Sequence, residues 1–270
     1  MTGTTLQGSK VLVTGAGSGI GRLMAIGAAR RGARVAIWDR DGERAERVRD
    51  EIGEHATAFT VDVTDKEAVR ATAAATGPVD VLVNNAGVVS GQRLLDATEE
   101  GIERTFAVNV LALFWVTRAF LPGMLERNQG SVVTIASAAG LIGVSQQTDY
   151  SSSKHAAVGF DETLRAELRA MRSDVRTMVV CPYYIDTGMF AGVRTRFPWL
   201  LPILKEQRVA DAVLTGIEKG KRRLVLPPLV GLVPTLRILP VPVFDAAADL
   251  LGVNQSMTHF TGRPGDVVGH

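Results

Sequence analysis

A glycine-rich turn limits the choice of fold for this sequence more than any other segment does. The turn, Thr14–Gly21, follows a short apolar run and precedes a segment with the apolar spacing of a helix. Glycines at such a place permit a tight turn and bring a helix N-terminus close to a pyrophosphate. Asp39 ends the next apolar run, 18 residues after Gly21, where an acidic residue can meet a ribose. The combination predicts a dinucleotide-binding βαβ unit.

The rest of the chain continues the same alternation of short apolar runs and longer helix-period segments. This order is typical of a parallel sheet with helices on both faces. We therefore predict an α/β fold: a single doubly wound domain of the Rossmann type over residues 1–222, with an apolar C-terminal extension of that domain over 223–270. Strands are expected at Lys10–Thr14, Arg34–Trp38, Thr57–Val61, Val79–Val83, Ser131–Ile135, Arg176–Val180 and Arg223–Leu226. Helices are expected at Ile20–Arg31, Gly42–Ile52, Asp65–Thr76 (with a capping box of Thr64 and Glu67), Glu99–Glu126, Asp149–Met171 and Arg208–Lys219.

Charge and cysteine content exclude several other classes of protein. The chain of 270 residues has 30 Lys+Arg against 28 Asp+Glu, a net charge of +2, which is too small and too scattered to mark a nucleic-acid-binding face. Its single cysteine, Cys181, excludes an internal disulfide and fits a reducing compartment. Residues 1–10 lack the apolar core of a signal peptide or anchor, so we expect a cytoplasmic protein.

Tyr150 and Lys154 form the first candidate for chemistry. They are four residues apart at the start of an expected helix and therefore share one of its faces. A phenol with an ordinary pKa of about 10 exchanges protons poorly at neutral pH. A neighbouring ammonium, a cationic nicotinamide and a helix N-terminus all favour the phenolate, so we expect the pKa of Tyr150 to be lowered towards neutrality.

Four motifs in order resemble the short-chain dehydrogenase/reductase family over about residues 8 to 220. They are the glycine-rich turn, Asn84-Asn85-Ala86-Gly87 after a strand, Ser137, and the segment from Tyr150 to Lys154. The resemblance implies a Rossmann fold and a catalytic tetrad. In it Tyr150 is the general acid and base, Ser137 hydrogen-bonds the substrate oxygen, Lys154 holds the nicotinamide ribose, and Asn109 holds a water in a proton relay.

The same resemblance implies where a nicotinamide dinucleotide binds. At the ribose, Asp39 can accept hydrogen bonds from both hydroxyls and would repel a 2′-phosphate, so we predict NAD rather than NADP, although Arg40 lies next to it. The segment from Pro182 to Thr187 resembles the family's Pro-Gly segment, with Tyr183 in place of the glycine. The predicted cofactor-binding residues are Gly15, Gly17, Ser18, Gly19, Ile20, Gly21, Asp39, Arg40, Asp62, Val63, Asn85, Ala86, Gly87, Tyr150, Lys154, Pro182, Ile185 and Thr187.

An apolar set of side chains is expected around the nicotinamide, which predicts a hydrophobic alcohol or carbonyl substrate. Stretches such as Asp186–Phe190 also resemble the retinol and hydroxysteroid dehydrogenase branch of the family. The predicted substrate-binding residues are Ser137, Tyr150, Tyr183 and Met189, with Val88, Val89, Leu141, Ile142, Tyr184, Phe190 and Phe197 nearby. The alternative is a non-catalytic NAD-binding regulator or scaffold on the same fold, because a fold does not prove chemistry.

Two surfaces have open interpretations. Leu224–Val253 is strongly apolar, but its five prolines, Arg237 and Asp245 prevent one membrane-spanning helix. It is either a flap over the binding site or a subunit contact, or else a patch that rests peripherally on a membrane. The expected helix Glu99–Glu126 is apolar on nearly every side, which predicts a subunit interface. The family resemblance implies a homodimer or homotetramer.

Overall fold

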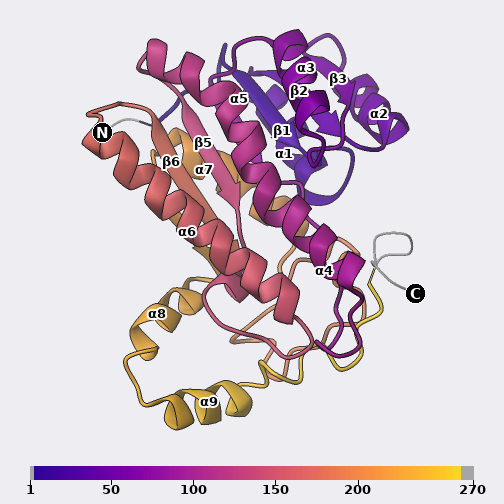
Figure 1. Cartoon of the computed structure of the whole chain (residues 1–270), viewed down its shortest axis with the longest axis vertical. Helices are drawn as coiled ribbons and strands as arrows, with labels where there is room; N and C mark the ends of the chain where they lie inside the picture. Colours follow the sequence, from indigo (N-terminus) through magenta and orange to yellow (C-terminus); the bar gives the residue numbers. More distant parts are fainter. Residues whose placement is uncertain (1–2, 263–270) are drawn as a thin grey trace.

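The computed structural model describes residues 3–262 of the chain. Seven parallel strands form one sheet in the order β3-β2-β1-β4-β5-β6-β7 (Figure 1). The chain starts in the middle of the sheet, proceeds outward to β3, and then returns to the other side of β1. The Rossmann fold is thus confirmed. The strands are β1 Lys10–Thr14, β2 Arg34–Asp39, β3 Ala56–Thr60, β4 Val81–Asn84, β5 Ser131–Ile135, β6 Arg176–Pro182 and β7 Arg223–Leu226.

Helices cover both faces of the sheet. One hydrophobic cluster joins the sheet to α1, α2 and α7, and a second joins the opposite face to α3, α5 and α6. The helices are α1 Gly19–Arg30, α2 Gly42–Ile52, α3 Lys66–Thr76, α4 Glu99–Phe106, α5 Ala112–Glu126, α6 Thr148–Ala170, α7 Glu206–Glu218, α8 Val233–Leu236 and α9 Val241–Leu250. The shorter elements are a π-helical turn η1 at Ala107–Leu111 and the 3₁₀ turns η2 at Ala138–Gly140 and η3 at Pro228–Leu232.

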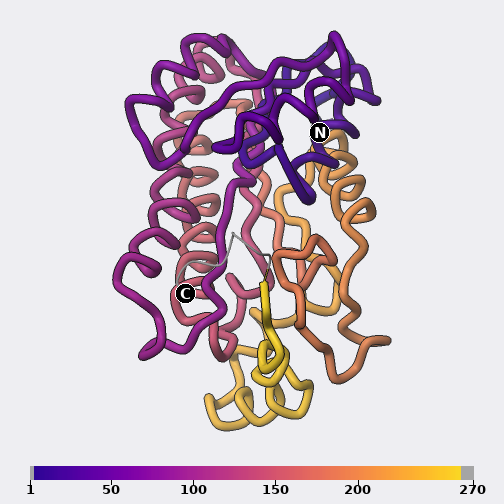
Figure 2. The backbone as a smooth tube through the Cα atoms, turned by 90° about the vertical axis from the view of Figure 1, so that its right-hand side faces the viewer, coloured from indigo at the N-terminus to yellow at the C-terminus, as the bar shows by residue number. Residues whose placement is uncertain are grey.

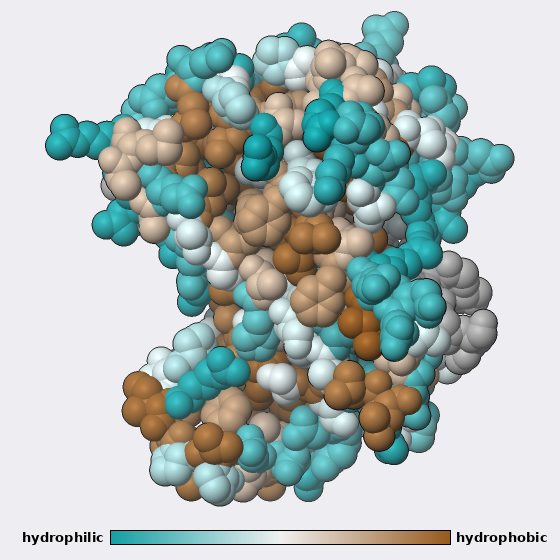
Figure 3. All heavy atoms as spheres, viewed as in Figure 1, coloured by the Kyte–Doolittle hydropathy of each residue, from teal (hydrophilic) through white to brown (hydrophobic). Residues whose placement is uncertain are grey.

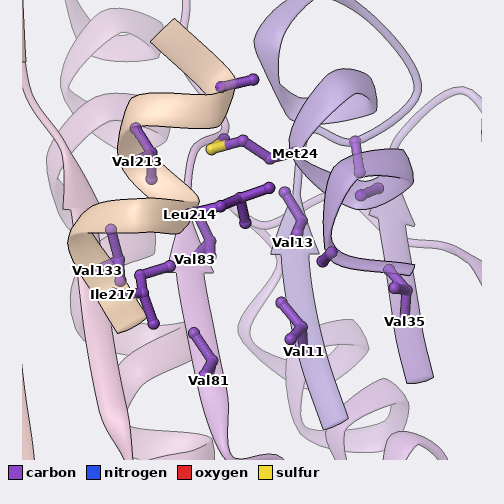
Figure 4. Close-up of a cluster of buried hydrophobic side chains, with 14 of the residues drawn as sticks. Val11, Val13, Met24, Val35, Val81, Val83, Val133, Val213, Leu214 and Ile217 are labelled. Atoms are coloured by element: carbon purple, nitrogen blue, oxygen red, sulfur yellow. The ribbon is translucent and has the colours of Figure 1, made fainter. Parts of the chain in front are cut away.

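Alternate strand residues supply the two cores, as the period of a β-strand requires. Val11 and Val13 of β1 face α1 and α7, where they lie close to Met24 and Leu214 (Figure 4). On the other face Trp38 is fully buried, and its indole N–H donates to Thr76 Oγ1 at 3.0 Å. The central strands are almost wholly buried, which explains their continuous apolar sequence.

Several expected boundaries differ from the structure by one or two residues, and one capping arrangement is wrong. Helix α3 is capped by Asp65, whose Oδ1 accepts from the N–H groups of Glu67 at 2.9 Å and Ala68 at 3.0 Å. Thr64 cannot form the expected capping box because its hydroxyl donates to Asp62 Oδ1 at 2.7 Å. Aspartate is a cap as strong as threonine, so the adjacent residue takes the position.

The expected helix Glu99–Glu126 is one helical run with a π-helical turn in its middle, at η1. By length and composition alone, this run is also the one helix within residues 3–262 that could cross a membrane. It packs, however, against α3, α6 and β4 as part of the second core cluster. Its position is that of a core helix of the domain.

The C-terminal extension leaves the main body of the molecule after β7. Its turn η3 and helices α8 and α9 form a separate lobe below the carboxyl ends of the strands (Figures 1 and 2). Prolines stand at the start of all three elements, where their missing N–H is tolerated. The prolines thus divide the apolar segment into short helices, and it does not form the single long helix that its sequence excludes.

Removing a core side chain tests the packing of α7 on the sheet. Leu214→Ala should lower the free energy of unfolding by about 3 kcal/mol, because a fully buried leucine leaves a cavity that the core fills only partly. Chemical denaturation measures the loss. The control is Leu95→Ala, at a leucine that is 96% exposed, which should change stability by less than about 0.5 kcal/mol. Equal effects of the two substitutions would contradict the described core.

Candidate active site

A cavity of about 580 Å³ lies at the carboxyl ends of the strands, across the junction of β1 and β4. This is where the chain reverses its direction across the sheet, and where ligands bind in open α/β sheets. Every predicted cofactor-binding residue except Gly17 lines it. These are Gly15, Ser18, Gly19, Ile20, Gly21, Asp39, Arg40, Asp62, Val63, Asn85, Ala86, Gly87, Tyr150, Lys154, Pro182, Ile185 and Thr187.

Gly17 lies behind the cavity wall and joins the turn to Asp39. Its N–H donates to Asp39 Oδ2 at 2.7 Å, while Asp39 Oδ1 accepts from the Asp41 N–H at 3.0 Å. A Cβ at Gly17 would approach Arg44 Cβ to 2.8 Å, which is too close for any larger residue. Gly17, which was predicted to bind the cofactor, therefore does not line the cavity, and instead holds Asp39, which does.

Hydrogen bonds fasten the glycine-rich turn to the segment after β4. The hydroxyl oxygen of Thr14 accepts from the N–H groups of Asn85 at 3.0 Å and Ala86 at 3.1 Å. In return the Asn85 amide donates to the carbonyls of Thr14 at 2.9 Å and Gly15 at 3.2 Å. Gly15 has a φ of +63° and lies so near Ala86 that a Cβ would come within 2.9 Å. These contacts leave the two turns no freedom to separate.

The start of α1 fits an anionic group. Gly19, Ile20 and Gly21 face the cavity, and the first turn of α1 carries no acidic side chain. By contrast, α2 and α3 carry Glu43 and Glu67 there. A carboxylate in the first turn of a helix would compete with a phosphate for the free N–H groups and repel it, so its absence from α1 suits phosphate binding. With the Asp39 carboxylate also lining the cavity and bound to the turn through the Gly17 N–H, the residues present fit a dinucleotide with a ribose hydroxyl pair.

Ser137, Tyr150 and Lys154 meet at the inner end of this cavity. Ser137 follows β5, and its hydroxyl is hydrogen-bonded to the Tyr150 phenol. Lys154 Nζ lies 5.6 Å from the centre of the Tyr150 ring and donates to the Ile135 carbonyl at 3.0 Å. Tyr150 and Lys154 are both buried on one face of α6, as their spacing predicts.

Burial dominates the protonation of both groups. It raises the pKa of the Tyr150 phenol above its ordinary value, and the hydrogen bond with Ser137 offsets only part of this. Burial also lowers the pKa of the Lys154 ammonium to about 8, because a charged group loses hydration inside the protein. The expected lowering of the Tyr150 pKa therefore does not come from the side chains of this chain. They keep the phenol protonated at neutral pH.

Asn109 lies at the centre of the π-helical turn η1, away from the cavity wall. Its Oδ1 accepts from the Val88 N–H and its Nδ2 donates to the Val88 carbonyl, both at 2.9 Å. Nδ2 also donates to Ser153 Oγ at 3.0 Å, and that hydroxyl donates to the Tyr150 carbonyl at 2.7 Å. The amide thus joins α4 and α5, the segment after β4, and the helix of Tyr150.

A second polar residue in this region, Asp149, was not anticipated from the sequence. The carboxylate is buried and accepts from the hydroxyls of Ser90 and Thr105, each at 2.8 Å. It joins the first turn of α6 to α4 and to the segment after β4. Its position directly before Tyr150 in the sequence was the one feature from which a role near the site could have been predicted.

A second cavity, of about 300 Å³, opens from the first. The two share Ser137, Tyr150, Tyr183 and Phe190. Of the other residues expected near the substrate, Ile142 and Tyr184 line the second cavity, Val88 and Met189 line the first, and Val89, Leu141 and Phe197 line neither. Part of its wall comes from the segment Leu224–Val253, for which a flap over the binding site was one interpretation: Leu229, Val230, Leu232, Val233, Leu236, Leu239, Phe244, Ala247, Ala248, Leu251 and Val253. Sequence reasoning missed the rest of the wall, which is Ala138, Ala139, Val144, Gln147, Leu200 and Leu201.

The cysteine lies near the site but outside its cavities. Cys181, in β6, is buried, and burial raises the pKa of its thiol to about 12. A thiol with this pKa carries almost no thiolate at neutral pH, and the thiolate is the nucleophile. Cys181 is a packing residue of the sheet.

Comparison with known proteins identifies this combination of turn, sheet and side chains. The family described as short chain dehydrogenase matches residues 9–197. The chain belongs to the short-chain dehydrogenase family. It is an NAD(P)-dependent oxidoreductase that acts on CH–OH groups. One similar protein is "Epidermal retinol dehydrogenase 2" of Mus musculus, which is 39% identical over 268 residues that cover 96% of this chain and 87% of the relative.

Solved structures of the family superpose on most of the chain. A short-chain dehydrogenase/reductase from Burkholderia phymatum, crystallised in complex with NAD, has a TM-score of 0.79 and 28% identity, and covers 87% of this chain and 94% of its own. A short-chain dehydrogenase from Burkholderia cenocepacia J2315, in complex with NADP, has a TM-score of 0.79 and 27% identity, and covers 90% and 98%. The similar structures thus include complexes with either nucleotide.

Proposed function

We propose that this dehydrogenase interconverts a hydrophobic alcohol of retinoid, steroid or long-chain type and its carbonyl compound. The second cavity carries the proposal. Its lining holds no charged side chain among the described residues, and its polar side chains are Ser137, Gln147, Tyr150, Tyr183 and Tyr184. The remaining wall is aliphatic or aromatic, which favours a largely apolar ligand with one polar end. The retinol dehydrogenase relative agrees with this substrate class.

The polar end of the substrate belongs between Ser137 and Tyr150. A bound nicotinamide would supply the redox chemistry: NAD(P)⁺ would take the hydride from the alcohol, and NAD(P)H would return it to the carbonyl. In the reducing direction, the protonated Tyr150 phenol donates its proton to the substrate oxygen, while Ser137 hydrogen-bonds that oxygen. In the oxidising direction, Tyr150 takes the hydroxyl proton back. The Lys154 ammonium, 5.6 Å from the phenol ring, stabilises the phenolate formed in between.

For the cofactor we propose a preference for NAD. The half-buried Asp39 lines the cavity and is fixed by the N–H groups of Gly17 and Asp41. A carboxylate held there accepts hydrogen bonds from ribose hydroxyls and repels a 2′-phosphate. Arg40 lines the same cavity and would weaken that repulsion.

We further propose that the C-terminal lobe rests on a lipid surface. Exposed apolar side chains gather on it, among them Leu232, Ile238 (84% exposed) and Val241 (71% exposed) (Figure 3). Arg237 is the one charged residue between Leu224 and Phe244. Exposed apolar surface of this kind marks an interaction site, and the second cavity reaches into the same lobe through Leu232, Leu236 and Leu239. A hydrophobic substrate dissolves in lipid rather than water, which favours a membrane over a protein partner.

The homo-oligomer and the cytoplasmic location stay predictions. The exposed side chains of Leu111 and Phe114, on η1 and α5, favour a contact with a second copy of the chain. Phe114 stacks edge-on with Phe160 of α6, at 5.0 Å between ring centres, so both helices contribute to one surface. Light scattering measures the oligomeric state, and a monomer would contradict the contact.

Substitution of Tyr150 tests the reaction. Tyr150→Phe should lower kcat/KM by at least about 100-fold on a panel of retinoid, steroid and long-chain alcohols, because general acid–base catalysis contributes about that much or more. The increase in NADH absorbance follows oxidation of these alcohols. NADH fluorescence checks that nucleotide binding persists. Unchanged turnover would contradict the role of Tyr150. Nucleotide binding without turnover by the parent enzyme on any panel substrate would favour the non-catalytic alternative.

Neutralising Asp39 tests the cofactor preference. Asp39→Asn keeps an oxygen for the Gly17 N–H but removes the charge, so the ratio of kcat/KM with NADP to that with NAD should rise by about tenfold, or ~1.4 kcal/mol. The control is Asp41→Asn, at a carboxylate that caps α2 and does not line the cavity. A ratio that moves equally in both variants, or in neither, would contradict ribose recognition by Asp39.

Vesicle flotation tests the lipid contact. The parent protein should float with vesicles of phosphatidylcholine and phosphatidylserine, and Ile238→Ser with Val241→Ser should abolish flotation because the inserted apolar area is lost. Leu95→Ser removes a leucine from another loop that is even more exposed, at 96%, and should leave flotation unchanged. If the parent protein stays in solution and forms oligomers that the Ile238 and Val241 substitutions dissociate, the lobe is a protein interface instead.

A further inference from the structure

The last described segment, Ser256–Gly262, runs beside the active site as a strap between two loops. The Arg194 N–H donates to the Ser256 carbonyl at 3.1 Å, and the Thr261 N–H donates to the Ala191 carbonyl at 2.9 Å. The Tyr184 hydroxyl lies 2.8 Å from Ser256 Oγ. Figure 2 shows this segment, in yellow, between the loop after β4 and the loop after β6. The strap is therefore tied along its length to the loop that carries Met189 and Phe190.

Two glycines make room for the strap. Gly91, in the loop after β4, has a φ of +68°, and a Cβ there would lie 2.1 Å from Phe260 Cε1. Gly192, in the loop after β6, has a φ of +85°, and a Cβ there would lie 1.9 Å from the His259 carbonyl oxygen. A side chain at either place would push the strap away. The two loops are thus shaped to receive it from opposite sides.

Phe260 points from the strap into the cluster around Tyr150. It packs against the cluster that Val89, Ala139 and Tyr150 form, and against the neighbouring cluster that contains Tyr184 and Met257. Phe190 lies in both clusters, edge-on to Tyr150 at 5.8 Å and to Tyr184 at 5.1 Å between ring centres. Phe260 itself lines neither cavity. It therefore acts on the site through the two clusters that it packs against.

We propose that Phe260 is a positioning residue for the dehydrogenase reaction: from the strap it packs, together with Phe190, against the cluster around Tyr150, and this packing keeps Tyr150 in place and excludes water from its phenol. The inference rests on the proposed function, in which Tyr150 transfers the proton. Phe190 belongs to a loop of turns and bends between Asp186 and Leu201, so its ring needs an outside support. Burial is also what raises the pKa of Tyr150, and this burial depends on the closed cluster.

Replacement of Phe260 and displacement of its ring should have the same effect. Phe260→Ala removes the ring, while Gly91→Ala pushes it aside. Gly77→Ala is the control, because Gly77 has a similar φ of +70° but nothing within 4 Å of a Cβ. Beyond the backbone strain that Gly77→Ala also carries, the double variant Gly91→Ala with Phe260→Ala should lose no more activity than Phe260→Ala alone, because the added methyl then meets no ring. Phe260→Leu should restore part of the activity.

The pH profile separates positioning from a merely structural role. With Phe260→Ala or Gly91→Ala, kcat for alcohol oxidation should fall by at least about fivefold, and the midpoint of its rise with pH should decrease by at least about 0.5 unit, because water that reaches the phenol lowers its pKa towards the ordinary value. The titratable groups that face Tyr150 are Lys154 and Tyr184, and these substitutions leave both in place. A lowered Tm with unchanged kcat and midpoint would overturn the proposal.

Hydrogen exchange tests the strap without turnover. Phe260→Ala should increase amide exchange in residues 187–193, which the strap and Phe260 hold, while Gly77→Ala should not. Unchanged exchange in this loop would overturn the proposal whatever the reaction is. Turnover that survives Tyr150→Phe, by contrast, would overturn the proposed function and leave the exchange result standing. The two failures are thereby distinguished.

Discussion

The hydroxyl of Thr14 joins the turns that follow β1 and β4, the two strands at which the chain changes direction across the sheet. It accepts from two backbone N–H groups after β4, while the Asn85 amide binds the carbonyls on the β1 side. The glycine-rich turn, the start of α1 and the segment that reaches Val88 are therefore held at one distance. Through Val88 this hydrogen-bond network continues to Asn109 and then to Ser153, on the helix that carries Tyr150.

Within this frame, desolvation is the main electrostatic effect on the reacting groups. Desolvation raises the pKa of Tyr150 and lowers the pKa of Lys154, and both shifts favour the uncharged form of the side chain. The phenol thus stays protonated and can act as an acid. The hydrogen bond with Ser137 opposes the effect of burial by lowering the pKa of Tyr150. A site of this kind favours proton donation to an oxygen that gains negative charge during hydride transfer. Such a charge is poorly hydrated here, so the hydroxyls of Tyr150 and Ser137 are the groups that stabilise it.

Local sequence patterns were sufficient for the sheet and for most of the cofactor cavity, because most of the contributing residues lie at or just after the end of a strand and the topology brings those ends together. They were insufficient wherever a contact joins distant segments. Gln147 and Leu251 share a cavity although 104 residues separate them, and Phe260 reaches Tyr150 from the other end of the chain. The pKa of Tyr150 could not be obtained from its neighbours in sequence either, since its burial depends on Phe190 and the strap. At α3, two adjacent residues could serve as the cap, and only the structure shows that Asp65 does.

The walls of the two cavities come from different parts of the chain. The segment matched by the family ends at residue 197, and it supplies the entire described lining of the first cavity. Most of the apolar wall of the second lies beyond it, from Leu200 to Val253. The C-terminal part of this wall can therefore vary in sequence without any change in the lining of the first cavity. A chimera that joins this C-terminal lobe to another dehydrogenase of the family would transfer only the part of the wall from Leu229 to Val253, and the recipient would supply the remainder.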